Sequence, residues 1–297
     1  MRAWGPAPDM VLPTPEELGR FHRNYAEGFW QYVRASPGAR RHDGDGMTLM
    51  RCDLRHPTSN VAFVHDPAAS LEASLSAAEA FFDRKDPWRM LWAGPAAPGL
   101  REVASRHRLR PAPEDPGMLL SPIVSPPAPP PRMTVRVAST SEDLDAFGKV
   151  WCASFRIPPW FFPLVLPRIP PDDPARGAQN RFIVGFEDRQ PVACASVTVT
   201  EGVAGVASVG TVPESRGKGY GTAITWAAVD AGRMLGADSA YLAASKMGYP
   251  VYARMGFRRV ADYPSWQTRF GFFGLLRVVR TARRLLKTRT PSPLNPT

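Results

Sequence analysis

The chain has few of the residues that hold metal ions or disulfide frameworks. Its 297 residues include only three cysteines, Cys52, Cys152 and Cys194, and no two of them form a Cys-x-x-Cys pair. All five histidines lie in the N-terminal half, without the spacing of metal ligands. We therefore expect no zinc cluster, no disulfide scaffold and no metal cofactor.

Long apolar runs are also missing. No stretch approaches the roughly 18 consecutive apolar residues of a transmembrane helix. The opening Met-Arg-Ala-Trp-Gly-Pro has no apolar core of a signal peptide. We therefore expect a soluble, cytoplasmic protein. Apolar residues still make up 44% of the chain, and at roughly 100–200 residues per domain the length favours two domains.

Residues 267–297 contain no acidic residue. They hold seven Lys and Arg residues, so this tail carries +7 of the formal net charge of +10. Between residues 275 and 289, apolar and basic side chains fall on opposite sides of a helical projection, as in a basic amphipathic helix. Such a helix docks on an anionic membrane surface, contacts nucleic-acid phosphates, or covers the protein's own core with its apolar stripe. We favour the third interpretation, do not expect nucleic acid as a partner, and leave a peripheral membrane contact open.

Proline is abundant, with 33 residues, and many of them cluster. The segment Ser-Pro-Pro-Ala-Pro-Pro-Pro-Arg at 125–132 favours an extended polyproline spacer, which we take as the main domain boundary. The predicted organisation is an N-terminal α/β domain at 1–124, a linker at 125–132, a second α/β domain at 133–266 and the basic tail at 267–297.

Periodic apolar patterns predict a mixed α/β chain. In the first half we expect helices at 13–36, 70–82 and 99–107 and strands at 47–54, 60–65, 90–92 and 118–123. Thr14 and Glu17 have the spacing of a capping box at the start of the first helix. In the second half we expect helices at 142–155, 222–235 and 250–255 and strands at 133–137, 181–187, 192–200, 204–212, 240–245 and 257–266.

A glycine-rich loop, Arg216-Gly-Lys-Gly-Tyr-Gly221, lies between a predicted strand and a predicted helix. The first turn of a helix has free N–H groups and the positive end of the helix dipole, so it binds anions. The glycines permit a tight curl and a close approach of the backbone, which suits a phosphate or pyrophosphate. The loop lacks the Gly-Lys-Ser/Thr of a P-loop, and its G-x-G-x-G spacing differs from the G-x-G-x-x-G of dinucleotide-binding folds.

The loop resembles the acetyl-CoA signature of the GNAT superfamily of N-acetyltransferases, R/Q-x-x-G-x-G/A, with Arg216, Gly219 and Gly221 at the fixed positions. Downstream, Val251-Tyr-Ala-Arg-Met-Gly-Phe257 is similar to the family's Y-x-x-x-G-F element. The resemblance covers residues 133–266 and implies that they form a catalytic GNAT domain, with the mixed-sheet acyl-CoA N-acyltransferase fold. It also implies transfer of an acetyl group from acetyl-CoA to a primary amine by direct attack.

The resemblance further implies the roles of individual residues. Backbone groups of Val209, Gly210 and Thr211 would bind the pantetheine arm of acetyl-CoA. The residues that would cradle its pyrophosphate are Arg216, Gly217, Lys218, Gly219, Tyr220, Gly221 and Thr222. Tyr252 would be the general acid, because a phenol with a pKa of about 10 holds a proton at neutral pH and can return it to a departing thiolate. Ser245 stands where the family often has an Asn that contacts coenzyme A.

Residues 157–177 form a proline-rich loop that corresponds to the acceptor segment of this family. Its Trp160, Phe161 and Phe162 either form an apolar wall for the acceptor or pack against the N-terminal domain. Asp172 and Asp173 could attract a cationic amine.

The general base stays open in the sequence. Glu187, Glu201 and Glu214 are candidates, and an ordered water that relays the proton is an alternative. A module that binds acyl-CoA without turnover is a second interpretation of the whole chain, and a protein that acts through its basic tail is a third. The sequence does not indicate the acceptor amine, the length of the acyl chain or the oligomeric state.

The N-terminal half has neither the glycine loop nor a Y-x-x-x-G-F element. Its alternating strands and helices nevertheless look like a degenerate copy of the same fold, so we expect two GNAT-like domains in tandem. Such a copy would contribute buried surface and one wall of the substrate cleft.

Overall fold

The computed structural model describes residues 13–44, 46–65, 70–83, 86–92, 99–165 and 172–288. The helices are α1 Pro15–Val33, α2 Leu71–Phe81, α3 Leu100–Arg106, α4 Ser141–Phe155, α5 Phe162–Val165, α6 Tyr220–Met234, α7 Tyr249–Arg254 and α8 Phe272–Thr288. The strands are β1 Arg40–Gly44, β2 Met47–Arg51, β3 Val61–Val64, β4 Arg89–Trp92, β5 Arg110–Leu120, β6 Met133–Val137, β7 Gln179–Glu187, β8 Gln190–Thr200, β9 Val203–Thr211, β10 Ser239–Ala243 and β11 Arg258–Gln267. Short 3-10 turns occur at Pro159–Phe161, Pro174–Arg176 and Pro213–Ser215.

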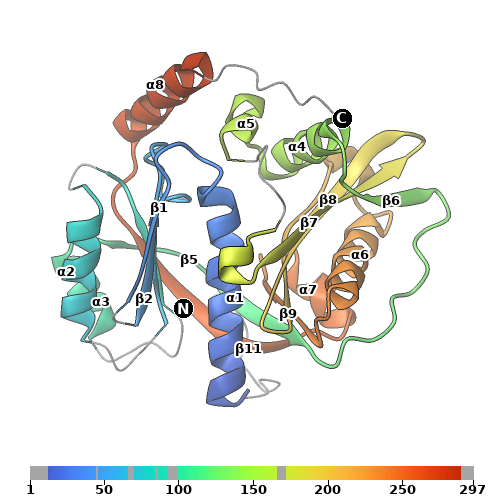
Figure 1. Ribbon diagram of the computed structural model, residues 1–297, viewed down its shortest axis with the longest axis horizontal. Coiled ribbons are helices and arrows are strands. Elements are labelled where there is room, and N and C mark those ends of the chain that lie inside the picture. The colour runs from blue at the N-terminus through green and yellow to red at the C-terminus, as the bar shows by residue number, and fades with distance from the viewer. Residues whose placement is uncertain are drawn as a thin grey trace.

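All of these strands join in one 11-stranded sheet, in the order β1-β2-β3-β4-β11-β5-β10-β9-β8-β7-β6. In Figure 1, β1 and β2 lie on the left and β7 and β6 on the right. The strands β5 and β11 pair antiparallel at its centre. The end of β5, Gly117–Leu120, pairs with β10 of the C-terminal half. The end of β11, Ser265–Gln267, pairs with β4 of the N-terminal half. Each half of the sheet therefore contains a piece of a strand that comes from the other half of the chain.

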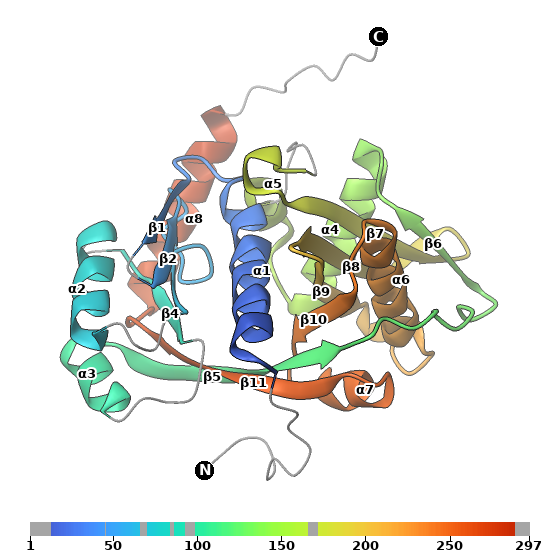
Figure 2. The same cartoon turned by 60° about the horizontal axis from the view of Figure 1, so that its bottom comes forward.

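Helices cover both faces of this sheet (Figure 2). In the C-terminal half, α6 packs on one face of β7, β8 and β9, and α4 and α1 pack on the other. In the N-terminal half, α2 and α3 cover one face around Leu75 and Leu100. The helix α1 lies between the halves, because its Phe21 and Val33 belong to a core that also contains Val203 and Tyr241 of the C-terminal half.

Local signals in the sequence explain where α1 begins. The hydroxyl of Thr14 accepts a hydrogen bond from the Glu17 N–H at 3.2 Å, and the Glu17 carboxylate accepts from the Thr14 N–H at 2.8 Å. This is the predicted capping box, and it is confirmed. The other predicted helices and strands are also present, with boundaries that differ by a few residues.

Two strands depart from the prediction. The strand β1 was missed because Arg-Arg-His-Asp-Gly has no apolar alternation, and the structure places it at the solvated edge of the sheet. The strand β5 begins at Arg110 rather than 118, in spite of Pro111 and Pro113. Its first part pairs only with β11, whereas β10 joins from Gly117 onward. A proline is tolerated there, since an N–H that faces no neighbouring strand is not needed for the ladder.

The basic tail forms α8, and its apolar stripe is buried. Val278 is 2% exposed, Ala282 0% and Leu285 8%, and the last two belong to the core shared with α1. Arg277 forms an ion pair with the buried Asp86 at 3.6 Å. The tail therefore covers the protein's own core over its described part, and Arg289 lies outside the described residues. Among these residues, no helix has the length and apolar character needed to cross a membrane.

The buried His22 of α1 makes stability depend on pH. Its ring packs edge-on against Phe63 and Tyr263. Burial disfavours its charged form and lowers its pKa to about 3, with smaller effects from His65 and Arg23. The folded state therefore keeps His22 neutral, while the unfolded chain binds a proton below a pH of about 6.5.

We expect the free energy of unfolding to fall as the pH drops from 6.5 toward 3. The loss due to His22 alone should reach about 2–3 kcal/mol at pH 4.5, because each pH unit of differential protonation is worth about 1.4 kcal/mol. Urea unfolding at pH 7.0 and 4.5 measures the total change, and His22→Phe should remove this share of it. Equal losses in both proteins would show that His22 has no part in the acid sensitivity.

Candidate functional site

The central feature of the site is a gap between two parallel strands. The strand β10 pairs with β9 only where Ser239–Tyr241 faces Val203–Gly205. Beyond that point β9 continues to Thr211, while β10 stays paired with β5 as far as Ala243. The backbone of residues 206–211 thus has no partner strand on the β10 side, so its polar groups on that side are not part of a ladder. This gap contains the predicted Val209, Gly210 and Thr211.

A β-bulge in β9 precedes these residues. Gly210 pairs with Cys194 of β8, but Ala207 pairs with Ser196, so β9 holds one residue more than β8 across this interval. Ser208 has a φ of 54°, in the left-handed region that residues other than glycine rarely adopt. A bulge bends the strand and redirects the residues that follow it.

The glycine loop leads from β9 to α6. Gly217 has a φ of 78° and Gly219 a φ of 81°, which only glycine adopts without strain. The helix α6 begins at Tyr220 with Gly219 as its N-cap, and no side chain caps it. The N–H groups of the first turn are therefore available to an anion. A Cβ on Gly217 would meet no atom within 4 Å, so the loop is open.

The two cations of the loop have different partners. The ammonium of Lys218 lies 2.9 Å from the Glu187 carboxylate, to which the Tyr220 hydroxyl also donates at 2.6 Å. These two contacts, Tyr220 first, lower the pKa of Glu187. Arg216 instead donates to the backbone carbonyls of Thr211, at 3.2 Å, and Ser154, at 3.4 Å. Among the described residues no carboxylate pairs with Arg216, so it supplies the loop's uncompensated positive charge.

Tyr252 lies in α7, with its side chain packed among the core residues under α6. It is 8% exposed, its ring centroid lies 6.0 Å from that of Phe257, and it packs closely against Gly248. Burial raises the pKa of Tyr252 to about 12. Its hydroxyl has no hydrogen-bond partner within the described part of the chain. At neutral pH the phenol is thus protonated and its proton is not engaged.

Ser245 has a structural contact at the start of α7. Its hydroxyl accepts a hydrogen bond from the Gly248 N–H at 3.1 Å, and its carbonyl accepts from the Tyr249 N–H at 2.9 Å. The side chain is exposed. Ser245 therefore stabilises the turn before α7, the helix that contains Tyr252. Its contact with coenzyme A stays a prediction.

The candidate bases lie in different places. Glu201 occupies the turn between β8 and β9 and forms an ion pair with Arg23 at 2.6 Å, which lowers its pKa. The eight residues from Glu201 to Val209 correspond to about 26 Å of extended strand, so Glu201 is remote from Val209–Thr211. Glu187 is held at the glycine loop by Lys218. Glu214 lies in the 3-10 turn between β9 and that loop.

The aromatic residues of the acceptor loop are half-buried. Trp160 and Phe161 pack against the core shared by the two halves of the chain, and Phe161 faces His56 with ring centroids 6.1 Å apart. Phe162 packs on α4 against Phe147. The contacts of Trp160 and Phe161 fit packing against the N-terminal half, whereas Phe162 packs within the C-terminal half. A role of these residues in acceptor binding stays a prediction.

The two acids of the acceptor loop have cationic partners in the protein itself. Asp172 pairs with Arg181 at 2.8 Å and Asp173 with Arg34 at 3.6 Å. Their charges are therefore already compensated, which weakens their predicted attraction for a cationic amine.

In the N-terminal half, the parallel pair β3 and β4 and the helix α2 correspond to β9, β10 and α6, and they form no gap. The strands β3 and β4 pair in parallel over their full lengths, from Val61–Arg89 to Val64–Trp92, so no gap opens between them. The helix that follows, α2, is capped by the Ser70 hydroxyl, which accepts from the Ala73 N–H at 3.4 Å. This copy therefore lacks both the strand gap and the uncapped helix N-terminus of the C-terminal half.

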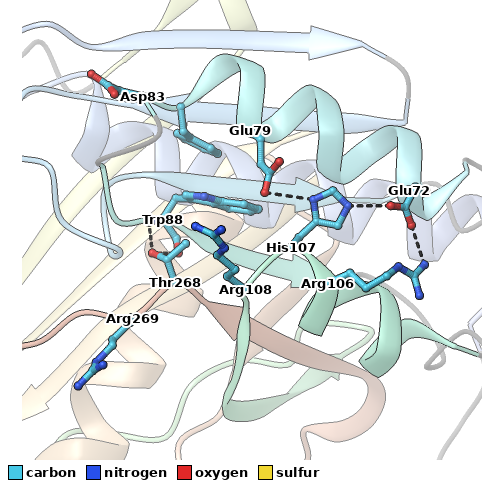
Figure 3. A pocket seen from close by; sticks show the side chains of 10 residues that line it. Glu72, Glu79, Asp83, Trp88, Arg106, His107, Arg108, Thr268 and Arg269 are labelled. Carbon is cyan, nitrogen blue, oxygen red and sulfur yellow. Dashed lines mark hydrogen bonds and ion pairs between the residues drawn. The ribbon is translucent and has the colours of Figure 1, made fainter.

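A cavity of about 570 Å³ lies in the N-terminal half, between α2, α3 and the segment after β11 (Figure 3). His107 points between Glu72 and Glu79, each 3.1 Å from a different ring nitrogen, and Arg106 pairs with Glu72 at 2.8 Å. None of the predicted site residues lines this cavity. The described residues also contain no cluster of His, Cys, Asp or Glu suited to a metal ion.

Comparisons with known proteins agree with the geometry of the C-terminal half. Residues 151–257 match the sequence model of the acetyltransferase (GNAT) family. No curated protein sequence matches the chain. The fold is similar to that of a GCN5-related N-acetyltransferase from Kribbella flavida, with a TM-score of 0.62 and 21% identity over 86% of this chain and 96% of that one.

Two further structures have a similar fold. A GCN5-related N-acetyltransferase from Sphaerobacter thermophilus matches with a TM-score of 0.56 and 17% identity, over 86% of this chain and 94% of that one. A tandem GNAT protein from the clavulanic acid biosynthesis pathway matches with a TM-score of 0.53 and 16% identity, over 88% of this chain and 97% of that one. Residues 151–257 thus match the GNAT acetyltransferase family, and the chain as a whole has the mixed α/β fold of GNAT structures, among them a tandem GNAT protein.

Proposed function

We propose that the protein is an N-acetyltransferase that transfers the acetyl group of acetyl-CoA to a primary amine. The observation that carries this proposal is the gap between β9 and β10, which ends at a glycine loop and an uncapped helix N-terminus. An extended ligand with a diphosphate at one end fits this order of groups. The GNAT match over the same residues supports acyl transfer as the reaction class.

The chain's own residues suit acetyl-CoA at each part of this path. Residues 206–211 offer an unpaired strand edge to the amides of the pantetheine arm. The first-turn N–H groups of α6 and the charge of Arg216 would bind the diphosphate. The open space beside Gly217 lets the diphosphate approach the backbone. Lys218 would contribute through its ion pair with Glu187, as a positioning contact of the loop.

When bound, acetyl-CoA supplies an activated acetyl thioester. A backbone N–H of residues 209–211 would donate to the thioester oxygen, where negative charge develops. Tyr252 Oη holds its proton at neutral pH and would deliver it to the departing sulfur. Glu187 is tied to the loop, Glu201 is remote, and Glu214 lies exposed in the 3-10 turn before the loop, so we assign the amine's proton to an ordered water.

The second candidate is a module that binds acyl-CoA without turnover. The ion pairs of Glu187 and Glu201 favour it, since both acids are unavailable as bases. The two candidates separate in one assay, in which acetyl-CoA, a panel of amines and a thiol reagent report the release of coenzyme A. The panel contains a polyamine, an aminoglycoside, a lysine peptide and a peptide with a free N-terminus. Saturable binding of coenzyme A with no release would favour the module.

Gly219→Ala should weaken the binding of coenzyme A at least tenfold. An L-residue at a φ of 81° costs about 1–2 kcal/mol, so the loop would shift away from its curl. Isothermal calorimetry measures the dissociation constant, and urea unfolding measures the stability.

Gly236→Ala is the matched control, because Gly236 has a φ of 91° just beyond the other end of α6 and a Cβ there meets no atom within 4 Å. It should lose similar stability but bind coenzyme A as the wild type does. Equal dissociation constants for the two variants would contradict a diphosphate site at the loop.

Tyr252→Phe should lower kcat by roughly 10²–10⁴, the usual contribution of a general acid, and leave the dissociation constant of acetyl-CoA within about twofold. In the wild type, ionisation of Tyr252 should not reduce kcat between pH 8 and 10, because its pKa of about 12 keeps the phenol protonated throughout this range. Steady-state kinetics over this pH range give both results. An unchanged kcat in Tyr252→Phe would remove the tyrosine from the reaction.

A further inference from the structure

The hydroxyl of Tyr32, in α1 of the N-terminal half, lies at the β-bulge of the C-terminal half. It is 2.5 Å from the Ser208 hydroxyl and 2.8 Å from the Ser196 hydroxyl. Ser208 is 176 residues away in the sequence and is the left-handed residue of the bulge. A helix of the degenerate copy thus contacts the turning point of the strand that leads into the gap.

The donors and acceptors of this cluster have one consistent order. The Ser196 hydroxyl donates to the Ala207 carbonyl at 3.3 Å, so its proton is already used. Tyr32 must then donate to Ser196, and Ser208 must donate to Tyr32. The bonds run from Ser208 to Tyr32, from Tyr32 to Ser196 and from Ser196 back to Ala207, next to Ser208 in the chain. They form a closed ring around the bulge.

The ring stabilises a conformation that the backbone alone disfavours. A residue with a Cβ in the left-handed region costs about 1–2 kcal/mol. The ring offsets this cost, since a hydrogen bond contributes about 0.5–1.5 kcal/mol and a buried hydroxyl without a partner costs more. Burial raises the pKa of Tyr32, so its hydroxyl stays protonated and keeps its place in the hydrogen-bond ring. Tyr32 therefore acts as a fixed link and does not serve as a base.

Other residues of α1 keep Tyr32 in place through contacts with the hairpin formed by β8 and β9. The Asn24 amide donates to the carbonyls of Thr198 and Val203 at 3.0 and 2.9 Å, where β9 begins. Arg23 pairs with Glu201 in the turn. The helix is thus attached at both ends of the interval between the turn and the bulge, and Tyr32 cannot shift without breaking these contacts.

We propose that Tyr32 is a positioning residue for acetyl transfer. The ring of hydrogen bonds through its hydroxyl holds Ser208 in the left-handed bulge and so orients the backbone of residues 209–211 toward the thioester. This inference rests on the proposed function for its catalytic part. It gives the N-terminal half a direct role in the site of the C-terminal half.

The test compares Tyr32→Phe, Ser208→Gly and the double variant. Tyr32→Phe should lower kcat at least fivefold and accelerate hydrogen exchange at residues 206–211, because the bulge loses its ring. Adding Ser208→Gly should recover most of kcat, since glycine adopts a φ near 54° without strain. A packing role for the tyrosine would not respond to this second change.

Tyr25→Phe is the matched control, because Tyr25 lies on the same helix and its ring contacts Phe29, Phe63, Tyr241 and Tyr263 rather than the bulge. It should leave kcat and exchange at residues 206–211 unchanged. Ser196→Ala removes the hydrogen bonds that Ser196 makes with Tyr32 and Ala207. It should reproduce the effect of Tyr32→Phe, so the test does not depend on the folding of one variant.

Wild-type exchange at residues 206–211 in both Tyr32→Phe and Ser196→Ala would overturn the proposal. So would a loss of kcat that Ser208→Gly fails to recover. A wild-type protein that acetylates no amine would instead refute the proposed function, and the exchange measurements would still decide whether Tyr32 holds the bulge.

Discussion

The strand β5 pairs with β10 on the side away from β9, and the arrangement of the site depends on this pairing. Because β10 follows β5 as far as Ala243, it is free to leave β9 after Tyr241. The separation of these two parallel strands exposes the backbone of residues 206–211. The strand β11 pairs with β5 in turn, and α7, which carries Tyr252, immediately precedes it. One strand from the N-terminal half thus sets the positions of the gap and of the phenol.

The glycine loop combines backbone and side-chain contributions in a way that its sequence does not reveal. Its two basic residues look equivalent in the sequence, yet Lys218 is neutralised by Glu187 while Arg216 binds only carbonyls among the described residues. The attraction for an anion therefore comes from Arg216 and from the first turn of α6. The contact of Tyr220 with Glu187 further joins the start of α6 to the end of β7.

Local signals made much of this structure predictable. The capping box of α1, the glycine loop and the Y-x-x-x-G-F element act over a few residues, and each marks its element in the sequence. Long-range contacts left no such signal. Nothing near Tyr32 indicates a bond to Ser208, and the prolines of β5 argue against a strand until its single-neighbour position is known. The bulge was likewise invisible, because Ser208 is an ordinary strand residue by composition.

The two copies of the fold differ most where a ligand would enter. The parallel pair β3 and β4 is closed by its ladder, and a serine caps α2. The pair β9 and β10 is open, and a glycine begins α6. A few local differences in strand pairing and helix capping thus separate the open copy from the closed one. The closed copy provides α1, whose Arg23, Asn24 and Tyr32 contact the β8–β9 hairpin from its turn to its bulge.

Because the end of β5 pairs with β10 and the end of β11 pairs with β4, dividing the chain into fragments breaks these pairings. A fragment that starts after the proline-rich segment would lack β5, so β10 and β11 would each lose the partner that joins them. The complementary fragment would have β4 without its neighbour β11 and would expose the buried end of β5. Any boundary drawn between the copies along the sequence therefore separates strands that pair in the sheet, either β5 from β10 and β11 or β4 from β11.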